Sequence, residues 1–484
     1  MIQKFDIAVI GSGPGGYRAA VLGALRGQRV AVVEKNDWGG CCLNRGCVPK
    51  KDWYHSARLV AASRGFARRG ISGSLSVDLG RAWEHQETVV RTVQDSYQDY
   101  LRRLGVVLLS GTAGFVSANV LDIRSDAAPQ RIQAEHVIVA TGSKPRVPPG
   151  ISPRSGQILT TDMLFDEPPP PGRRVAVLGG GLVGAEFAYI LSMLGLKVYW
   201  ISRRAPLART RFSAQALAVL DEALRDCGME ILENAEMTGS EWRNGELVLT
   251  FSGKPELAVD WLLLGTGRDP VTDGLAPDAA GVRLDPRGFV RVNERLQTDA
   301  PNIYAIGDCV SEPMTANQAM ADAAVALENI LAGDDVRMQR RRDELWVPEV
   351  IYSAVELARI GMNEDLAEDA GFEPAVGFAA FENSPQALGQ DDIRGFVRLI
   401  ADMDSAALLG AEVVGAEAGE IIHMLALAPD GSSALPLLAR SWVNHPTRAE
   451  EFVHAAETLA GKWGLADRIF GVPAPDRRPR RAQK

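Results

Sequence analysis

The chain has 484 residues, more than one hydrophobic core usually organises, so two to four domains are expected. A composition that is 46% hydrophobic and 23% charged excludes an intrinsically disordered chain. The net charge of −9 at pH 7 argues against a general nucleic-acid-binding protein, which normally carries a basic face.

The first predicted element is a strand, glycine turn, helix and second strand, the βαβ unit that binds dinucleotides. Its strands are expected at 7–10 and 30–33. Glycines in the turn let backbone N–H groups approach a pyrophosphate at the helix N-terminus. Glu34, at the end of the second strand, can accept hydrogen bonds from the ribose of an adenosine. The turn glycines are Gly11, Gly13 and Gly16.

The N-terminal residues and the cysteine content together indicate a cellular compartment. The first residues run straight into the strand and do not resemble a signal peptide, and no apolar stretch reaches membrane-spanning length. A cytoplasmic location without membrane partners is therefore expected, and disulfides there are rare unless they are catalytic. The five cysteines and six histidines show no zinc-ligand spacing, so no metal site is expected.

Three of the cysteines crowd into seven residues after the first unit: Cys41, Cys42 and Cys47. Cys41 is either a small buried filler or a source of mispaired thiols. Cys227 and Cys309 are expected in the packed interior.

The second βαβ unit has strands expected at 175–178 and 198–201, with turn glycines Gly179, Gly181 and Gly184. The offset of eighteen residues that leads from the last glycine to Glu34 in the first copy leads here to Ser202, followed by Arg203 and Arg204. A carboxylate would repel a 2′-phosphate, whereas two guanidiniums beside a hydroxyl bind it. The sequence therefore favours NADPH over NADH. The alternative is that both arginines merely face solvent.

The segment GGCCLNRGCVPKK, residues 39–51, resembles the active-site motif of the class I pyridine nucleotide-disulfide oxidoreductases. This family includes dihydrolipoamide dehydrogenase, glutathione reductase and mercuric reductase. The resemblance implies bound FAD and a redox disulfide between Cys42 and Cys47. It makes Cys47 the sulfur nearer the flavin and Cys42 the interchange thiol that meets the substrate.

Other segments that match the family extend the resemblance over nearly the whole chain. NHPTRAEEF, residues 444–452, resembles its His-Pro-Thr motif, which makes His445 the base and Glu450 the carboxylate that orients it. In the family this histidine reaches the disulfide of the partner subunit, so a homodimer is implied. Lys51 corresponds to the lysine beside the flavin, with Glu186 as its ion-pair partner.

Three further segments resemble flavin and chain-crossing motifs of the family. IYAIGDC, residues 303–309, resembles the second flavin motif, in which Asp308 would bind the ribitol. VIVATGSKPR, from Val137, and LLLGTGRDP, from Leu262, resemble the two segments where the chain crosses between domains.

The fold class implied is α/β, with two Rossmann-like dinucleotide-binding domains, for FAD and NAD(P), and a C-terminal α+β dimerisation domain. Pro168 to Pro171 read as a stiff linker, and the charge run at 334–344 marks another boundary. The expected division is FAD domain 1–150, NAD(P) domain 151–271, second FAD segment 272–345, dimerisation domain 346–470 and a disordered basic tail 471–484.

The member of the family is less sharply indicated, because GPGGY and GAEAGEIIHMLALA look like dihydrolipoamide dehydrogenase whereas CVPKK and HPTRAEE look closer to glutathione reductase. The first choice is a dihydrolipoamide dehydrogenase-like enzyme that uses FAD and NADP(H) and acts on lipoamide of a lipoyl carrier protein. The second is an NADPH-dependent glutathione-type reductase. A non-catalytic flavoprotein scaffold is the third.

Overall fold

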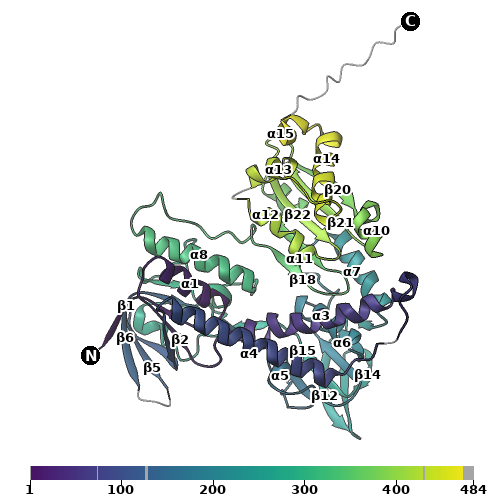
Figure 1. The fold of residues 1–484 in the computed structure, drawn as a ribbon. Coiled ribbons are helices and arrows are strands. Elements are labelled where there is room, and N and C mark those ends of the chain that lie inside the picture. Colours follow the sequence, from purple (N-terminus) through teal and green to yellow (C-terminus); the bar gives the residue numbers. More distant parts are fainter. Residues whose placement is uncertain (1, 74, 126–128, 429–430, 472–484) are drawn as a thin grey trace. The chain divides into compact units, whose positions relative to one another are not determined.

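The computed structural model describes residues 2–73, 75–125, 129–428 and 431–471 (Figure 1). All but the first residue of the expected basic tail lies outside these residues. The chain divides into two compact units. Unit one comprises Met1–Ala208 and Gly228–Glu344, and unit two comprises Arg209–Cys227 and Leu345–Lys484.

The first sheet of unit one grows from the first predicted βαβ unit. Its strand order is β3-β2-β1-β6-β5-β4, and β17 also pairs with β6. The strands β3, β2, β1, β6 and β17 run parallel, whereas β5 and β4 are antiparallel additions. The strands are β1 (Gln3–Ile10), β2 (Val30–Glu34), β3 (Val107–Ser110), β4 (Thr112–Ser117), β5 (Val120–Arg124), β6 (Gln130–Val139) and β17 (Ile303–Ala305).

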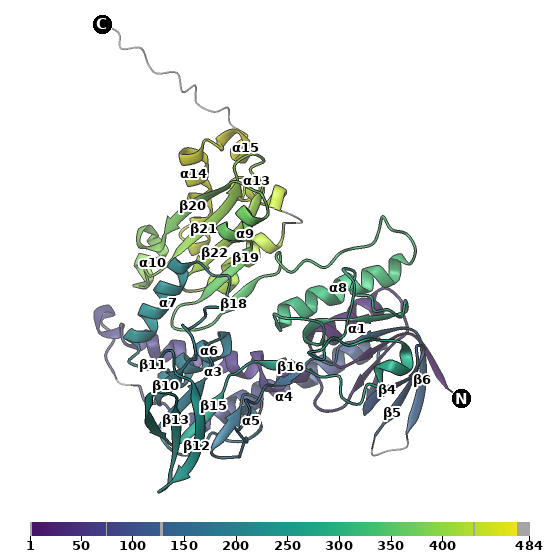
Figure 2. The same ribbon diagram turned by 180° about the vertical axis from the view of Figure 1, so that it is seen from behind.

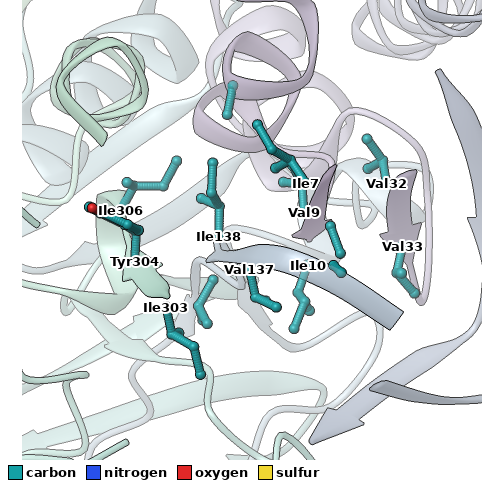
Figure 3. Close-up of a cluster of buried hydrophobic side chains, with 14 of the residues drawn as sticks. Ile7, Val9, Ile10, Val32, Val33, Val137, Ile138, Ile303, Tyr304 and Ile306 are labelled. Atoms are coloured by element: carbon teal, nitrogen blue, oxygen red, sulfur yellow. The ribbon is translucent and has the colours of Figure 1, made fainter. Parts of the chain in front are cut away.

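The core of this sheet is made of β-branched and aliphatic side chains from strands far apart in sequence (Figure 3). Ile7 lies opposite Val30 on one side and His136 on the other, and Ile303 lies opposite Val137. Parallel strands buried on both faces require such continuous apolar runs. The predicted strands at 7–10 and 30–33 are therefore present, and the first begins earlier, at Gln3.

The second sheet of unit one is entirely parallel, in the order β11-β10-β9-β15-β8. A three-stranded antiparallel sheet and a two-stranded ribbon, β7 with β16, complete the unit. The parallel strands are β8 (Ile158–Thr160), β9 (Arg174–Leu178), β10 (Lys197–Ile201), β11 (Glu230–Leu232) and β15 (Trp261–Leu264). The others are β7 (Ser143–Pro145), β12 (Met237–Arg243), β13 (Glu246–Phe251), β14 (Lys254–Val259) and β16 (Arg268–Pro270).

The helices of unit one start where the sequence supplies caps. Pro14 occupies the first turn of α1, and the side chains of Asp78 and Thr315 accept N–H bonds at the starts of α4 and α8. Helices α1 and α8 lie side by side on the first sheet (Figures 1 and 2). The helices are α1 (Pro14–Leu25), α2 (Gly40–Arg45), α3 (Cys47–Ser63), α4 (Leu79–Arg103), α5 (Met163–Asp166), α6 (Leu182–Met193) and α8 (Ala316–Ala332). The 3₁₀ turns are η1 (Phe66–Arg69), η2 (Pro277–Ala280) and η3 (Gly307–Cys309).

Unit two is an antiparallel sheet in the order β18-β19-β22-β21-β20, with α14 packed on β20 and β21. Gly377 permits this close packing, because a Cβ there would lie 2.2 Å from Ala455 O of α14. The strands are β18 (Glu349–Ile351), β19 (Leu357–Gly361), β20 (Pro374–Ala380), β21 (Phe396–Asp402) and β22 (Leu408–Val414). The helices are α9 (Glu364–Asp369), α10 (Pro385–Gln390), α11 (Ala418–Ile421), α12 (His423–Ala426), α13 (Gly431–Ala439), α14 (Glu451–Trp463) and α15 (Ala466–Phe470), with 3₁₀ turns η4 (Phe381–Asn383) and η5 (Arg448–Glu450).

One helix groups differently from the sequence-based division. Helix α7 (Ala214–Asp226) was expected inside the NAD(P) domain, but it belongs to unit two. The Ser213 N–H donates to Glu412 Oε1 at 2.6 Å, and Arg394 Nη2 pairs with Asp226 Oδ2 at 2.6 Å. These polar contacts with the antiparallel sheet and its loops hold both ends of α7. The remaining expected boundaries stay predictions.

The expected fold class is confirmed, with one mixed and one fully parallel dinucleotide-type sheet in unit one and an α+β arrangement in unit two. Among the described residues, no single helix has the length and hydropathy to cross a membrane. A sharply bent pair, Ala418–Ala426 with Gly431–Ala439, meets the length and composition criterion only when both parts are taken together.

Candidate active site

The Cys42–Cys47 segment consists of the short helix α2, one glycine and the start of α3. Gly46 joins the two helices with little room, because a Cβ there would lie 3.1 Å from both Cys41 O and Cys42 Cα. This turn brings the side chains of Cys42 and Cys47 into hydrogen-bond contact, and both are free thiols. Cys47 is also the first residue of α3, where the helix dipole favours a thiolate.

The two thiols are polarised in opposite directions. The hydrogen bond from Cys42, together with the nearby Lys50, lowers the pKa of Cys47 to about 7 in spite of its burial. The same hydrogen bond and burial raise the pKa of Cys42 well above its usual value. At neutral pH the pair therefore divides into a thiol at Cys42 and a sulfur at Cys47 that ionises readily.

An ion pair between α3 and α6 supports Cys47, and it corrects one expectation. The lysine that the structure pairs with Glu186 is Lys50, whereas the sequence pointed to its neighbour Lys51. Lys50 lies three residues after Cys47, hence on the same face of α3. Burial alone would lower the pKa of Lys50, but Glu186 and Cys47 raise it overall, and Glu186 is only 3% exposed. The assignment of Lys51 to the flavin site stays a prediction.

Cys41 sits in a separate polar environment. Arg268 Nη2 donates to its sulfur at 3.2 Å, and Asp162 Oδ1 lies 3.8 Å from the same atom. Burial raises the pKa of Cys41 to about 12, although Arg268 opposes this. The Cys41 thiol is therefore neutral at pH 7 and does not form part of the polarised Cys42–Cys47 pair.

Replacement of Cys41 by serine is expected to leave disulfide turnover within about twofold of wild type, because a neutral thiol is a poor nucleophile. Iodoacetamide at pH 7.5 should label the Cys42–Cys47 pair of the reduced protein and spare Cys41, as measured by peptide mass spectrometry. Labelling of Cys41 at the rate of Cys47 would contradict this assignment.

Arg268 also links the redox segment to Asp308, on η3. Arg268 Nε donates to Ser143 Oγ at 2.7 Å, and this hydroxyl donates to Asp308 Oδ2 at 2.6 Å. Burial raises the pKa of Asp308, while Ser143 and Arg268 act in the opposite direction. Ser143 and Arg268 lie on the paired strands β7 and β16, inside the segments that resemble chain-crossing motifs. The sequence motifs therefore indicated the two segments, but they did not predict that Ser143 and Arg268 would contact each other.

The first glycine turn has the shape that a bound pyrophosphate requires. Gly11 has φ = 103°, and a Cβ there would lie 2.3 Å from Ala140 O, so glycine is required. Gly13 faces open space at the N-terminus of α1, which leaves room for a phosphate to approach backbone N–H groups. Gly16 packs against Gly11, since a Cβ on Gly16 would lie 1.9 Å from Gly11 O.

At the end of β2, Glu34 is buried and already oriented. Its Oε2 accepts hydrogen bonds from Ser12 N at 2.9 Å and Ser12 Oγ at 2.7 Å, and its Oε1 accepts one from Asn36 N at 2.9 Å. A carboxylate has about four acceptor positions, so it can still receive a ribose hydroxyl. The sequence did not identify Ser12 as the residue that holds it.

The second glycine turn has the same backbone geometry, but its turn and strand end carry different side chains from those of the first. Gly179 has φ = 135° and approaches Gly265 O, Gly181 faces open space, and Gly184 packs on Gly179. Ser202 Oγ lies 1.9 Å from where a Cβ on Gly180 would be.

Where the turn meets the end of β10, the buried polar side chain is therefore Ser202 of the strand end, and the adjacent turn residue is Gly180. We call this place the corner. Arg203 and Arg204 follow Ser202 and are exposed. The strand end thus carries a buried serine followed by two exposed arginines, where the first copy carries the buried Glu34.

In unit two, His445 and Glu450 form a hydrogen-bonded pair. His445 Nδ1 lies 2.8 Å from Glu450 Oε1, and Glu450 Oε2 accepts the Thr447 N–H at 2.7 Å. Burial would raise the pKa of Glu450, but the Thr447 N–H and His445 lower it overall. The imidazole is 72% exposed, so with Nδ1 held by the carboxylate its Nε2 is free to exchange protons outward.

The predicted site residues thus fall into two groups, one in each unit. Unit one gathers the thiol pair, Glu186, Asp308 and both glycine turns, and unit two holds the histidine–glutamate pair. Within the described ranges, no three His, Cys, Asp or Glu side chains gather as metal ligands.

Comparisons with known proteins match two long ranges of the chain. Residues 5–323 match the family model described as pyridine nucleotide-disulphide oxidoreductase, and residues 347–456 match its dimerisation domain. The chain is 33% identical to a dihydrolipoyl dehydrogenase of Thermus scotoductus over 463 residues, covering 95% of this chain and 98% of the relative. It is also 33% identical to a dihydrolipoyl dehydrogenase of Haloferax volcanii, covering 94% and 96%.

Solved structures agree with this picture. The HOCl-induced flavoprotein disulfide reductase RclA of Escherichia coli, in its Cu(II) complex, is 26% identical, with a TM-score of 0.81 and coverage of 94% of this chain and 99% of that one. LpdA of Mycobacterium tuberculosis shares the fold at 22% identity, with a TM-score of 0.87 and coverage of 95% and 100%.

Proposed function

Because this chain belongs to the pyridine nucleotide-disulphide oxidoreductase family, we propose that it is a dihydrolipoyl dehydrogenase-like enzyme that prefers NADP(H). Its class is that of FAD-dependent enzymes that pass two electrons between a nicotinamide dinucleotide and a dithiol or disulfide. The observation that carries the proposal is the oppositely polarised pair Cys42–Cys47 beside the ion pair Lys50–Glu186.

The residues present fit FAD. The open position at Gly13, the carboxylate of Glu34 and the buried carboxyl of Asp308 are suited to the pyrophosphate, the adenosine ribose and the ribitol, respectively. Bound FAD supplies two-electron exchange between a hydride donor and a disulfide. Lys50, held by Glu186, places a positive charge beside Cys47 and so stabilises its thiolate.

The thiol chemistry follows from the two pKa shifts. In the oxidising direction, one substrate thiolate attacks Cys42 Sγ of the Cys42–Cys47 disulfide, forms a mixed disulfide and releases Cys47 as a thiolate. The positive charge of Lys50, which lowers the pKa of Cys47, favours the departure of this sulfur as a thiolate. The second substrate thiolate then attacks the substrate sulfur bound to Cys42, which closes the substrate disulfide and releases Cys42. The electron pair of the dithiol now resides on the two cysteines.

Cys42 needs a base, because its raised pKa keeps it protonated when it must attack a disulfide in the reverse direction. We assign this role to His445 of the second subunit, with Glu450 fixing the tautomer that exposes Nε2. The dimerisation domain and the full-length relatives support the homodimer that this arrangement requires.

The lipoyl group is the proposed substrate because the full-length relatives named above are dihydrolipoyl dehydrogenases. A cytoplasmic location and a lipoyl carrier protein as partner belong to the same proposal. Initial rates with dihydrolipoamide, lipoamide and glutathione disulfide, each with both nicotinamide cofactors, test it. The highest kcat/KM is expected for the lipoyl pair with NADP(H), and a higher value for glutathione disulfide would replace the proposal by a glutathione-type reductase.

The preference for NADP(H) rests on the corner formed by Ser202, Arg203 and Arg204. The double variant Ser202→Glu with Arg203→Ala is expected to lower kcat/KM for the NADP cofactor at least about tenfold, since it removes a charge-assisted hydrogen bond and adds a like charge. The value for the NAD cofactor should change less than about threefold. Arg173→Ala, which changes an exposed arginine before the opposite end of β9, is the control. Unchanged preference in the double variant would contradict the assignment.

A further inference from the structure

A buried arginine lies in the same turn as the His445–Glu450 pair. Arg448 is the first residue of η5, which ends at Glu450, and its side chain is only 2% exposed. Arginine is almost never fully buried unless its guanidinium is held by partners. No part of the chemistry described above uses this side chain.

The guanidinium of Arg448 is fastened to a different segment of unit two. Its Nε donates to Gln390 Oε1 at 3.0 Å, and its Nη2 donates to Asp392 O at 2.5 Å. The guanidinium carbon lies 4.9 Å from the centre of the Phe381 ring, in the geometry of a cation–π contact. The Asp392 carboxylate is 3.5 Å from Nη2 and half exposed.

These contacts connect the turn that carries His445 and Glu450 to residues 381–392. Thr447 caps η5, and its backbone N–H and the His445 imidazole both bond to Glu450. The planar fork of arginine restrains two acceptors at once, which a lysine cannot reproduce. Because Arg448 lies between Thr447 and Glu450, holding it against residues 381–392 holds the carboxylate that orients the imidazole.

The hydrogen bonds and the ring contact of Arg448 restrain the position of the turn. Burial would raise the pKa of Glu450, whereas the Thr447 N–H, His445 and His454 lower it overall. Burying a guanidinium beside one distant, half-exposed carboxylate is energetically unfavourable, and the hydrogen bonds to Gln390 and Asp392 offset part of this cost. This makes the anchor sensitive to small changes.

We propose that Arg448 is a positioning residue for disulfide exchange, which tethers the turn carrying His445 and Glu450 to the segment Phe381–Asp392. This inference rests on the proposed role of His445 as the base. It predicts that the loss of Arg448 impairs only the step that needs the imidazole.

The test compares Arg448→Met, Arg448→Lys and Gln390→Ala in the full-length holoenzyme. Dihydrolipoamide oxidation measures the step that uses His445, and ferricyanide reduction by the nicotinamide cofactor measures hydride transfer without it. Arg448→Met is expected to lower kcat for the dithiol about tenfold, with KM changed less than about twofold, since small misplacements of a catalytic group have effects of this size. Ferricyanide reduction should remain at the wild-type rate.

Two further comparisons separate positioning from general destabilisation. Arg359→Met removes another buried guanidinium of unit two, which pairs with Glu349 on the neighbouring strand, and should leave both activities unchanged. Arg448→Lys should recover part of the lost kcat. Gln390→Ala removes one anchor without changing charge and should give a smaller loss of the same kind, which keeps the test informative if Arg448→Met folds poorly.

The decisive experiment places Arg448→Met in a His445→Gln background. If Arg448 acts through the imidazole, the double variant is no slower than His445→Gln alone, which itself is expected to lose about 100-fold or more. An additive loss, a parallel fall in ferricyanide reduction, or a fully active Arg448→Met overturns the inference. A fully active His445→Gln instead overturns the proposed role of the base, which is a separate result.

Discussion

Replacing Cys42 or Cys47 by serine is expected to reduce dihydrolipoamide turnover at least about 1000-fold, because a hydroxyl cannot form the disulfide through which the electron pair passes. Hydride transfer should survive, so the nicotinamide cofactor should still bleach the flavin absorbance of both variants. Stopped-flow absorbance and steady-state rates measure the two steps separately. The Cys41→Ser variant provides a matched control with one sulfur removed from the same segment.

The two sulfurs should also differ in a pH titration of the reduced enzyme. The ionisation of Cys47, followed by long-wavelength absorbance of a thiolate beside the flavin, should have its midpoint near pH 7. In Cys42→Ala the hydrogen bond that contributes most to this shift is gone, so the midpoint should move upward toward 9, the pKa of an ordinary thiol. A midpoint that stays near 7 in Cys42→Ala would show that the hydrogen bond does not polarise the pair.

Removing the amine of Lys50 is expected to have the second large effect. Lys50→Met takes a buried ion-pair partner from Glu186, which is 3% exposed, and breaking such a pair destabilises a protein by about 3–5 kcal/mol. The pKa of Cys47 should rise as well, because Lys50 is one of the groups that lower it. Urea unfolding and the pH titration of the reduced enzyme measure the two consequences.

Lys51→Met is the matched control, since it removes an amine from the adjacent position of α3. A smaller change in the pKa of Cys47 is expected than for Lys50→Met, because Lys50 is one of the main groups that lower this pKa. The double variant Lys50→Met with Glu186→Gln should recover part of the stability, because no buried charge then loses its ion-pair partner. A larger change in the pKa of Cys47 in Lys51→Met than in Lys50→Met would instead favour Lys51, the residue that the sequence indicated, as the partner of Glu186.

The sequence predicted the two glycine turns and their strands because the constraints there are local. Gly11 and Gly179 both require φ > 0 and a close backbone approach, which glycine alone tolerates, and each follows an apolar strand directly. The spacing of Cys42 and Cys47 is equally local. These features could be read from short stretches of chain.

Contacts between distant segments could not be read in this way. Lys50 and Lys51 differ only by about 100° around α3, and the partner that distinguishes them is 136 residues away. Arg268 and Cys41 are separated by 227 residues. Helix α7 is amphipathic, but its sequence does not indicate which residues hold its ends, and in the structure Glu412 and Arg394 of unit two do so.

The burial of Arg448 could not be predicted from the sequence for a different reason. An arginine in a polar turn is normally solvated, so the sequence indicates an exposed side chain. In the structure its guanidinium contacts Phe381, Gln390 and Asp392, and the sequence around these residues shows no motif that predicts a buried cation.

The two βαβ units differ in the residues at the glycine turn and at the strand end beside it, and this difference has a consequence for changing the coenzyme preference. In one copy a serine in the turn steadies an acid at the strand end, and in the other a glycine in the turn makes space for a serine at the strand end. A lone acid introduced at Ser202 would lack the hydroxyl that steadies its counterpart Glu34. To convert the proposed NADP(H) preference to NAD(H), we therefore expect a paired exchange to be needed, Gly180→Ser together with Ser202→Glu, with the first βαβ unit of the same chain as the template.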